Sequence, residues 1–315
     1  MSTISSDRAS AGTRPVDPAL GIEPPVALVL CGGNSRGALQ VGFYWALWEL
    51  GLRPDFVIGS SIGALNGAFI AAGMSPDALA ELWLKFRRRD ALSWNLPWLF
   101  GLRDQPGLFS LERLRRTLRQ ALPVQRFEKL EMPLTVVTTD LQLGAPVYWS
   151  GSGDLIEPVV ASMSLPGLFP PVVIGAHQHV DGGVANKAPL DRAYELGART
   201  VLMIECVCCD PVLKRYISLL EVMTRSFSIA MDSKYNVDLE RLGSLVRIHV
   251  VRPRLAWDIG LLDFSYTAEL IEAGYRQSIE YLVPLAQAQN ALTCAPVVPG
   301  ASGTDTLTGL VERSS

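Results

Sequence analysis

Two short apolar runs, residues 26–31 and 56–58, each precede a glycine-containing loop and then a helical pattern. A continuous apolar run of this length is typical of a strand buried on both faces. Between the runs, residues 38–50 carry apolar side chains at helical spacing, and small residues continue a second helical pattern from Gly63 to Gly73. This alternation predicts an α/β fold with a mostly parallel central sheet flanked by helices.

Apolar runs later in the chain predict that the sheet continues, with helices between its strands. The expected strands are residues 134–139, 172–174, 200–206 and 245–251. The expected helices are residues 188–196, 212–241 and 264–282.

The composition suits one large folded domain. Of the 315 residues, 49% are hydrophobic and 19% are charged, a balance that excludes a disordered chain. We expect a single catalytic domain over residues 26–290, with a helical, basic excursion at about residues 76–123 that forms a cap. Residues 1–25 are polar and contain prolines, which predicts a flexible arm and not a signal peptide, and residues 291–315 predict a loose tail. The expected location is therefore cytoplasmic.

Charge and cysteine content argue against several classes of function. The net charge of −3 disfavours nucleic-acid binding, because contact with phosphates needs a basic surface. The five cysteines form no Cys-x-x-Cys pair and no zinc-like spacing with histidine. The sequence therefore predicts neither a disulfide framework nor a metal site.

The sequence Gly59-Ser60-Ser61-Ile62-Gly63 lies between the second predicted strand and the helix after it. A Gly-x-Ser-x-Gly sequence at such a junction places the serine on a tight bend, with the amino end of a helix directed at its exposed hydroxyl. We predict that Ser61 is a nucleophile and that Gly59 and Gly63 relieve crowding at the bend. The alternative interpretation is a packing turn made of small residues.

The loop Gly32-Gly33-Asn34-Ser35-Arg36-Gly37 follows the first predicted strand and precedes a helix. If the first two strands are neighbours, this loop and Ser61 share the carboxyl edge of the sheet, where open α/β sheets place their sites. The N–H groups of the loop would then stabilise the oxyanion of acyl transfer, and Arg36 would add charge or brace the loop. The alternative is a phosphate cradle for a nucleotide, although the glycine spacing differs from a dinucleotide fingerprint and no P-loop lysine follows.

The proton acceptor for Ser61 is predicted to be Asp181, in His179-Val180-Asp181-Gly182-Gly183. Glycines after an acidic residue at a strand end let the chain turn sharply into a site. The ordinary pKa of aspartate is about 3.9, so burial would have to raise it for useful proton transfer. The alternatives are an ordinary Asp-Gly-Gly turn and an α/β-hydrolase triad through His249, which lies inside a predicted strand.

Together with Ala161-Ser162-Met163-Ser164-Leu165-Pro166-Gly167-Leu168-Phe169-Pro170-Pro171, these three motifs resemble the patatin-like phospholipase family in content, order and approximate spacing. The resemblance covers about residues 26–206, and residues 263–275 are similar to the family's late helix. It implies an α/β fold related to the catalytic domain of cytosolic phospholipase A2. It also implies hydrolysis of lipid or phospholipid acyl esters, of the phospholipase A or lysophospholipase type, without a metal or other cofactor.

Carried onto this sequence, the resemblance implies a serine–aspartate dyad in which Ser61 attacks the acyl carbonyl and Asp181 accepts its proton. The amides of Gly32, Gly33 and Asn34 would hold the oxyanion, and Arg36 matches the basic position of the loop. The motif glycines are Gly37, Gly59, Gly63, Gly182 and Gly183. The chain departs from the family at Asn34, where a third glycine is usual, and at Lys187, where asparagine is common.

The basic, tryptophan-bearing stretch from Trp83 to Arg119 suggests peripheral contact with anionic membranes, because tryptophan favours the interface and arginine the charged surface. The alternative is a solvated helical face with core aromatics. For the whole chain, a lipid acyl hydrolase is the expected function. The alternatives are a catalytically silent lipid-binding or regulatory scaffold of the same fold and a nucleotide-binding protein.

Overall fold

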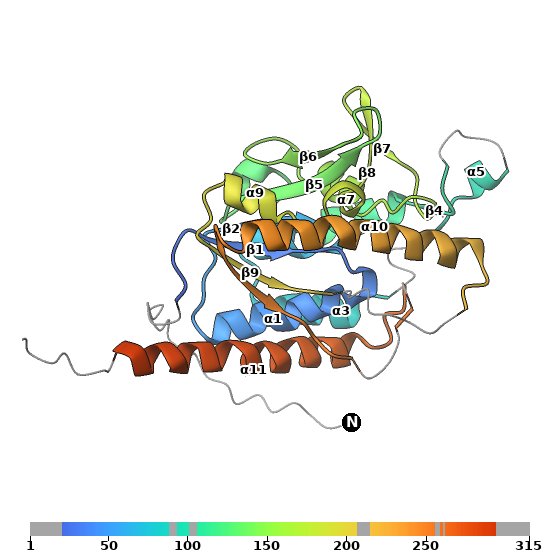
Figure 1. Ribbon diagram of the computed structural model, residues 1–315. Helices are drawn as coiled ribbons and strands as arrows, with labels where there is room; N and C mark the ends of the chain where they lie inside the picture. The colour runs from blue at the N-terminus through green and yellow to red at the C-terminus, as the bar shows by residue number, and fades with distance from the viewer. Residues whose placement is uncertain are drawn as a thin grey trace, which may run out of the picture.

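A single large sheet organises the part of the chain that the computed structural model describes, which is residues 21–87, 93–100, 106–206, 215–255, 259–260 and 262–293 (Figure 1). Its strands are β1 (Val26–Leu30), β2 (Phe56–Ser60), β5 (Leu134–Asp140), β6 (Ala145–Trp149), β7 (Val172–Ile174), β8 (His177–Asp181), β9 (Thr200–Ile204) and β10 (Arg247–Val251). The order in these described residues is β10-β9-β1-β2-β5-β8-β7, and β6 pairs with β5.

The sheet is parallel over most of its width. The strands β10, β9, β1, β2 and β5 pair in parallel, whereas β5 pairs antiparallel with both β6 and β8, and β7 with β8. Every residue of β1, β5 and β9 is buried, which explains the mainly apolar sequences of β1 and β9 and the apolar and threonine residues of β5. The predicted α/β class and the mostly parallel sheet are confirmed, while β6 has no counterpart among the expected strands.

Helices cover both faces of the sheet. One layer, below the sheet in Figure 1, contains α1 (Ala38–Glu49), α3 (Pro76–Lys85) and α11 (Thr267–Thr293). The other side carries α7 (Ile156–Ser162), α9 (Leu190–Glu195) and α10 (Leu219–Leu242), and the short α8 (Gly183–Asn186) follows β8 directly. The helix α2 (Ile62–Ala71) follows β2 and packs on β1, β2 and β5.

Two glycines bring α1 and α11 into backbone contact. A Cβ added at Gly42 would lie 2.0 Å from the carbonyl oxygen of Ile271, and a Cβ added at Gly274 would lie 2.2 Å from that of Leu39. Neither position has room for a side chain. The late helix is therefore packed firmly against the first helix of the fold.

The excursion at residues 76–123 contains α3, the hairpin of β3 (Ser93–Trp94) and β4 (Phe109–Ser110), α5 (Leu96–Leu99) and α6 (Glu112–Ala121). Its residues 88–92 and 101–105 lie outside the described part of the chain. Because α3 packs on α1 and α11, this part of the excursion belongs to a main helical layer. The helix α6 is joined to α7 by the Arg115–Glu157 ion pair, whose Nε–Oε1 distance is 2.8 Å.

The expected terminal arm and tail lie largely outside the described residues. At the amino end the structure begins before the predicted boundary at residue 25, since the N–H of Glu23 donates to Thr200 Oγ1 over 2.9 Å. At the other end α11 continues to Thr293, beyond the predicted boundary at residue 290. Among the helices of the described ranges, none combines the length and apolar character that a membrane span requires.

Candidate active site

Ser61 lies at the turn between β2 and α2, and its backbone has φ 57° and ψ −127°. A positive φ is disfavoured for a residue with a side chain, and such strain is concentrated at functional sites. The flanking glycines permit the turn, because a Cβ at Gly59 would lie 2.4 Å from the carbonyl oxygen of Gly63 and one at Gly63 would lie 2.0 Å from that of Leu30. The predicted bend is present, with Ser61 at its apex.

Ser61 and Asp181 form a hydrogen-bonded pair. The hydroxyl of Ser61 donates to Asp181 Oδ2 over 2.6 Å, and the other carboxylate oxygen, Oδ1, accepts the N–H of Gly183 over 2.8 Å. Both side chains are buried, with Ser61 8% and Asp181 3% exposed. The structure therefore places the expected nucleophile and the expected proton acceptor in direct contact.

The pairing of β5 explains how two residues 120 positions apart meet. Val137 of β5 pairs with Ser60 at the end of β2, and the next residue, Thr138, pairs with Asp181 at the end of β8. The opposite edge of β5 is occupied by β6 along the same residues. The carboxyl ends of β2 and β8 therefore face each other along one edge of β5.

Burial raises the pKa of Asp181 to about 6 from its ordinary value of 3.8. Loss of hydration is the largest cause, and the hydrogen bonds from Ser61 and Gly183 oppose it because they stabilise the carboxylate. A carboxylate with a pKa near 6 is a stronger base than an ordinary aspartate and is still mostly ionised at neutral pH. The pKa of Asp181 is therefore raised, as useful proton transfer from Ser61 would require.

The last residue of α7 and the segment that follows it support both members of the pair. Ser162 Oγ accepts the N–H of Ser61 over 2.8 Å, and the carbonyl oxygen of Ser164 accepts the N–H of Asp181 over 2.9 Å. Ser162 and Ser164 are both fully buried. In the sequence, the signal of this role is the close spacing of two serines before Leu165-Pro166.

The loop after β1 lies against Ser61. A Cβ at Gly32 would lie 3.2 Å from Ser61 Cβ, and one at Gly33 would lie 2.3 Å from Cys206 Cβ. Asn34 adopts a left-handed conformation with φ 52°, which asparagine tolerates better than most residues. Because β1 and β2 are parallel neighbours, this loop and the nucleophile share the carboxyl edge of the sheet, as expected.

Arg36 and Ser35 hold the loop from its far side. The guanidinium of Arg36 donates to the carbonyl oxygen of Ile259 over 2.8 Å, and the Ser35 hydroxyl donates to that of Gly260 over 3.1 Å. These contacts favour the bracing role of Arg36 over a place in the oxyanion hole.

The remaining motif glycines allow close packing. A Cβ on Gly37 would lie 2.4 Å from the Ile62 side chain, and one on Gly182 would lie 2.2 Å from the carbonyl oxygen of Val137.

A buried polar network ties the loop to α3. Gln40 Nε2 donates to the carbonyl oxygen of Cys31, Asn66 Nδ2 donates to Gln40 Oε1, and Trp83 Nε1 donates to Asn66 Oδ1, over 2.7 to 2.8 Å. Trp83 is only 4% exposed. The expectation that Trp83 contributes to a membrane surface is therefore wrong, because a polar network holds this indole inside the protein.

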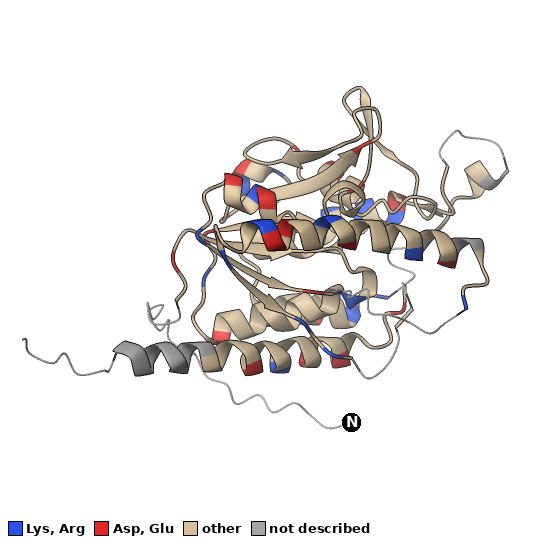
Figure 2. Ribbon diagram, in the orientation of Figure 1, with Lys and Arg blue, Asp and Glu red and all other residues tan. Residues whose placement is uncertain are grey.

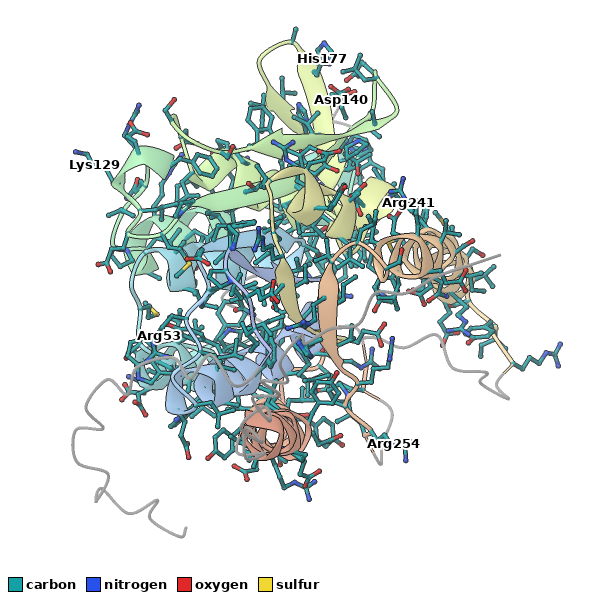
Figure 3. The ribbon with its side chains drawn as sticks, turned by 60° about the vertical axis from the view of Figure 1, so that its left-hand side comes forward. Arg53, Lys129, Asp140, His177, Arg241 and Arg254 are labelled. Carbon is teal, nitrogen blue, oxygen red and sulfur yellow. The ribbon has the colours of Figure 1, made fainter. Side chains whose placement is uncertain are left out.

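His249 and His177 lie away from the dyad. His249 is on β10, and β9 and β1 lie between that strand and β2, so the triad through His249 is wrong. His177 Nδ1 is 2.6 Å from Asp140 Oδ2, and Figure 3 shows this pair together at the top of the molecule.

Lys187, the second departure from the family pattern, is buried at the carboxyl end of α8. Its ammonium forms an ion pair with Asp232 of α10 and lies 5.7 Å from the ring centre of Tyr235. The effect is to join the turn after Asp181 to α10. Nothing in the sequence pointed to Asp232 as its partner.

Two cavities of different character meet at Ser61. One, of about 80 Å³, is bounded by α2, α3 and α6 and is lined mainly by apolar side chains, including Leu65, Phe69 and Leu118. The other, of about 60 Å³, lies on the side of Asp181, and its lining includes the polar side chains of Lys187, Ser228 and Asp232. Ser61 and Asn34 line both cavities.

A strained serine paired with a buried aspartate, beside a glycine loop, defines the chain as a candidate serine acyl hydrolase. A family model described as patatin-like phospholipase matches residues 28–194, and the chain belongs to this family. The matched segment includes Ser61, Asp181 and the loop at residues 32–37. Among the described residues, no group of three or more histidine, cysteine or acidic side chains is arranged to hold a metal ion.

Curated relatives are similar over part of their length. Patatin-like phospholipase domain-containing protein 7 of Rattus norvegicus is 34% identical over 185 residues, which are 57% of this chain and 13% of that protein. Neuropathy target esterase sws of Drosophila melanogaster is 30% identical over 182 residues, again 57% of this chain and 13% of that protein. The chain thus matches a small part of these much longer proteins.

Solved structures also resemble the chain at low identity. VipD of Legionella pneumophila is 14% identical, with a TM-score of 0.43 over 84% of this chain and 68% of its own. Human GIVD cytosolic phospholipase A2, in complex with methyl gamma-linolenyl fluorophosphonate, is 12% identical, with a TM-score of 0.40 over 87% of this chain and 60% of its own.

Proposed function

We propose that the protein hydrolyses acyl esters of lipids through a Ser61–Asp181 dyad. The observation that carries this proposal is the 2.6 Å hydrogen bond from a strained, buried serine to a carboxylate of raised pKa. Family membership supports a lipid acyl ester as the substrate.

The reaction takes two acyl transfers. Ser61 Oγ attacks the acyl carbonyl carbon while Asp181 Oδ2 takes the hydroxyl proton, and the tetrahedral oxyanion forms. When this species collapses, the carbon–oxygen bond of the ester breaks, and the leaving alcohol takes the proton from Asp181. Water then gives its proton to Asp181, attacks the acyl-enzyme and releases the fatty acid, and the proton returns to Ser61.

The loop at Gly32, Gly33 and Asn34 is the proposed oxyanion hole. Its backbone lies against Ser61, and its position is fixed by the Gln40–Asn66–Trp83 network and by Arg36. Donors held in advance stabilise developing charge without reorganisation, which is the largest contribution in many acyl-transfer enzymes.

The apolar cavity is the proposed acyl site. It reaches Ser61 between α2, α3 and α6, and aliphatic and aromatic side chains line it. Burial of an acyl chain there contributes about 0.8 kcal/mol for each methylene group.

We also propose that the protein contacts membranes through the β3–α5 segment. Trp94 and Phe100 are 62% and 73% exposed, and Leu96 beside them is also exposed. In Figure 2 the ribbon of α5, to the right of the domain, has no blue or red segment, so this helix contains no lysine, arginine, aspartate or glutamate. Aromatic side chains of this kind favour the lipid headgroup region. Arg88 and Arg89 of the basic stretch lie outside the described residues.

A fluorophosphonate probe tests the dyad. We expect a single adduct on Ser61 by peptide mapping, no adduct in Ser61→Ala, and labelling at least a hundredfold slower in Asp181→Asn. Ser60→Ala is the matched control, because Ser60 Oγ is buried and has no hydrogen-bond partner among the described residues. If the folded wild type forms no adduct, the silent lipid-binding scaffold becomes the better account.

A further inference from the structure

The polar cavity beside the dyad contains groups that acyl transfer itself does not use. It is lined by the dyad, by the oxyanion loop and, on the far side, by Lys187 and by Ser228, Met231 and Asp232 of α10. Ser61 lines both this cavity and the apolar one. An ester bound at Ser61 has an acyl group and an alcohol group. When the acyl group occupies the apolar cavity, the alcohol group enters the polar cavity.

One ion pair lies in the wall of the polar cavity, and a second lies close to it. Lys187 is paired with Asp232 in the wall, and Glu205 is paired with Arg252, whose Nε lies 3.0 Å from Oε2. Lys187, Asp232 and Glu205 are buried, whereas Arg252 is exposed. Asp181 adds a further carboxylate to the cavity wall, so the wall disfavours a phosphate and offers acceptors to a hydrogen-bond donor.

Asp232 has unused hydrogen-bonding capacity. Its residue is 8% exposed, and Oδ1 is engaged by Lys187. Its other oxygen, Oδ2, is buried and has no hydrogen-bond partner among the described residues. A buried carboxylate oxygen normally has a partner, so the missing one is a donor that the described chain does not supply. The last torsion of an aspartate is soft, which lets the carboxylate turn toward a group in the cavity.

We propose that this cavity binds the leaving alcohol of the substrate and that Asp232, held in place by Lys187, accepts a hydrogen bond from a free hydroxyl on that alcohol. The substrate class is then an acyl ester of a polyol with at least one hydroxyl unesterified. Lys187 and Asp232 are specificity-determining residues, whereas Ser61 and Asp181 carry the chemistry. This inference rests on the proposed function.

The test compares three esters of one fatty acid in the same detergent micelles: the glycerol 1-monoester, the propyl ester and the choline ester. For the wild type we expect the glycerol-to-propyl ratio of kcat/KM to exceed the ratio of their alkaline hydrolysis rates at least tenfold. A site built to bind a hydroxyl rejects the analogue that lacks it. Preference for the choline ester would mean that the cavity takes an ammonium group, and it would overturn the proposal.

A double variant, Lys187→Met with Asp232→Leu, removes the polar pair. Replacing both partners of a buried ion pair is often tolerated by the fold, unlike removal of one. We expect the glycerol-to-propyl ratio of kcat/KM to fall at least tenfold, to near the alkaline value, while the variant still hydrolyses the propyl ester. The matched control is Lys234→Met with Asp238→Leu, which removes an ion pair of α10 outside the cavity and should leave the ratio unchanged.

An unchanged ratio in a folded double variant would overturn the proposal. If that variant does not fold, the test rests on the glycerol-to-propyl ratio of kcat/KM in the wild type. A ratio equal to that of the alkaline hydrolysis rates would overturn the proposal. Failure of the proposed function looks different. In that case the wild type hydrolyses neither p-nitrophenyl butyrate nor any of the three esters, and the fluorophosphonate forms no adduct on Ser61.

Discussion

At the scale of single residues, the proposed role of Asp181 as the base ties activity to the pKa of its buried carboxylate. Its pKa of about 6 means that a proton occupies Oδ2 below that pH and blocks acceptance of the Ser61 proton. We expect kcat/KM for p-nitrophenyl butyrate to fall about tenfold for each pH unit below 6 and to level off above it. A rate profile that is flat between pH 4.5 and 7 would contradict Asp181 as the base.

The same pKa has a consequence for stability. Because the pKa of Asp181 is higher in the folded than in the unfolded protein, protonation of this carboxyl group favours folding. This contribution to the free energy of unfolding is complete below pH 3.8 and is lost as the pH rises through 6. Asp181→Asn cannot titrate, so the stability of this variant relative to wild type should grow between pH 4 and pH 7, by up to about 3 kcal/mol. Urea unfolding at the two pH values measures this difference, and a constant difference would disprove it.

Ser162 is expected to keep the nucleophile in place. Ser162→Ala leaves the N–H of Ser61 without its partner, and small misplacements of a reacting group cost about a hundredfold in rate. We expect the labelling rate and kcat to fall by about that factor with KM nearly unchanged. Ser278→Ala is the control, since Ser278 is another fully buried serine, bonded within α11 to the carbonyl oxygen of Gly274. Equal losses in both variants would indicate only a general structural effect.

Single residues also show where sequence reasoning succeeds. Ser61 and Asp181 were predictable because a glycine-flanked turn needs specific residue types next to each other. Ser162, Trp83 and Asp232 were not, because their roles depend on contacts between segments 17 to 101 positions apart. Local patterns carry no information on such pairings.

At the scale of elements, the β-strands were predictable from apolar runs, whereas their pairing was not. An apolar run predicts β2, whereas the Asp-Gly-Gly sequence predicts only that a strand ends near Asp181. The structure alone shows that β2 and β8 lie on one edge of β5. The strand β6 has partly exposed side chains throughout, so it lacks the continuous apolar run by which buried strands are found.

The contact between α1 and α11 gives a prediction of its own. In Gly274→Ala the added Cβ would lie 2.2 Å from the carbonyl oxygen of Leu39, so the helices must separate. We expect a loss of about 3 kcal/mol in the free energy of unfolding, as for other overpacked sites. Gly243→Ala should change it by less than about 1 kcal/mol, because Gly243 already has the helical φ of −61°. Similar losses in the two variants would contradict this packing argument.

At the scale of the whole molecule, the exposed aromatic side chains and the cavities raise the question of how lipid reaches Ser61. Replacing Trp94 and Phe100 by serine should weaken binding to phosphatidylglycerol–phosphatidylcholine vesicles at least tenfold, with p-nitrophenyl butyrate hydrolysis unchanged. Leu141→Ser with Leu143→Ser is the control, because these side chains are 47% and 65% exposed on the distant β5–β6 hairpin. Equal vesicle binding by wild type and the Trp94/Phe100 variant in a sedimentation assay would exclude this segment as the membrane contact.

The position of β2 and β8 on one edge of β5 has a consequence for the protein while it is being synthesised on the ribosome. A ribosome adds about 5 to 20 residues per second, so Ser61 precedes Asp181 by roughly 6 to 24 s. During that interval the nascent chain holds a nucleophile without its base. On the proposed mechanism, hydrolysis cannot begin until the strand bearing Asp181 has docked beside β5.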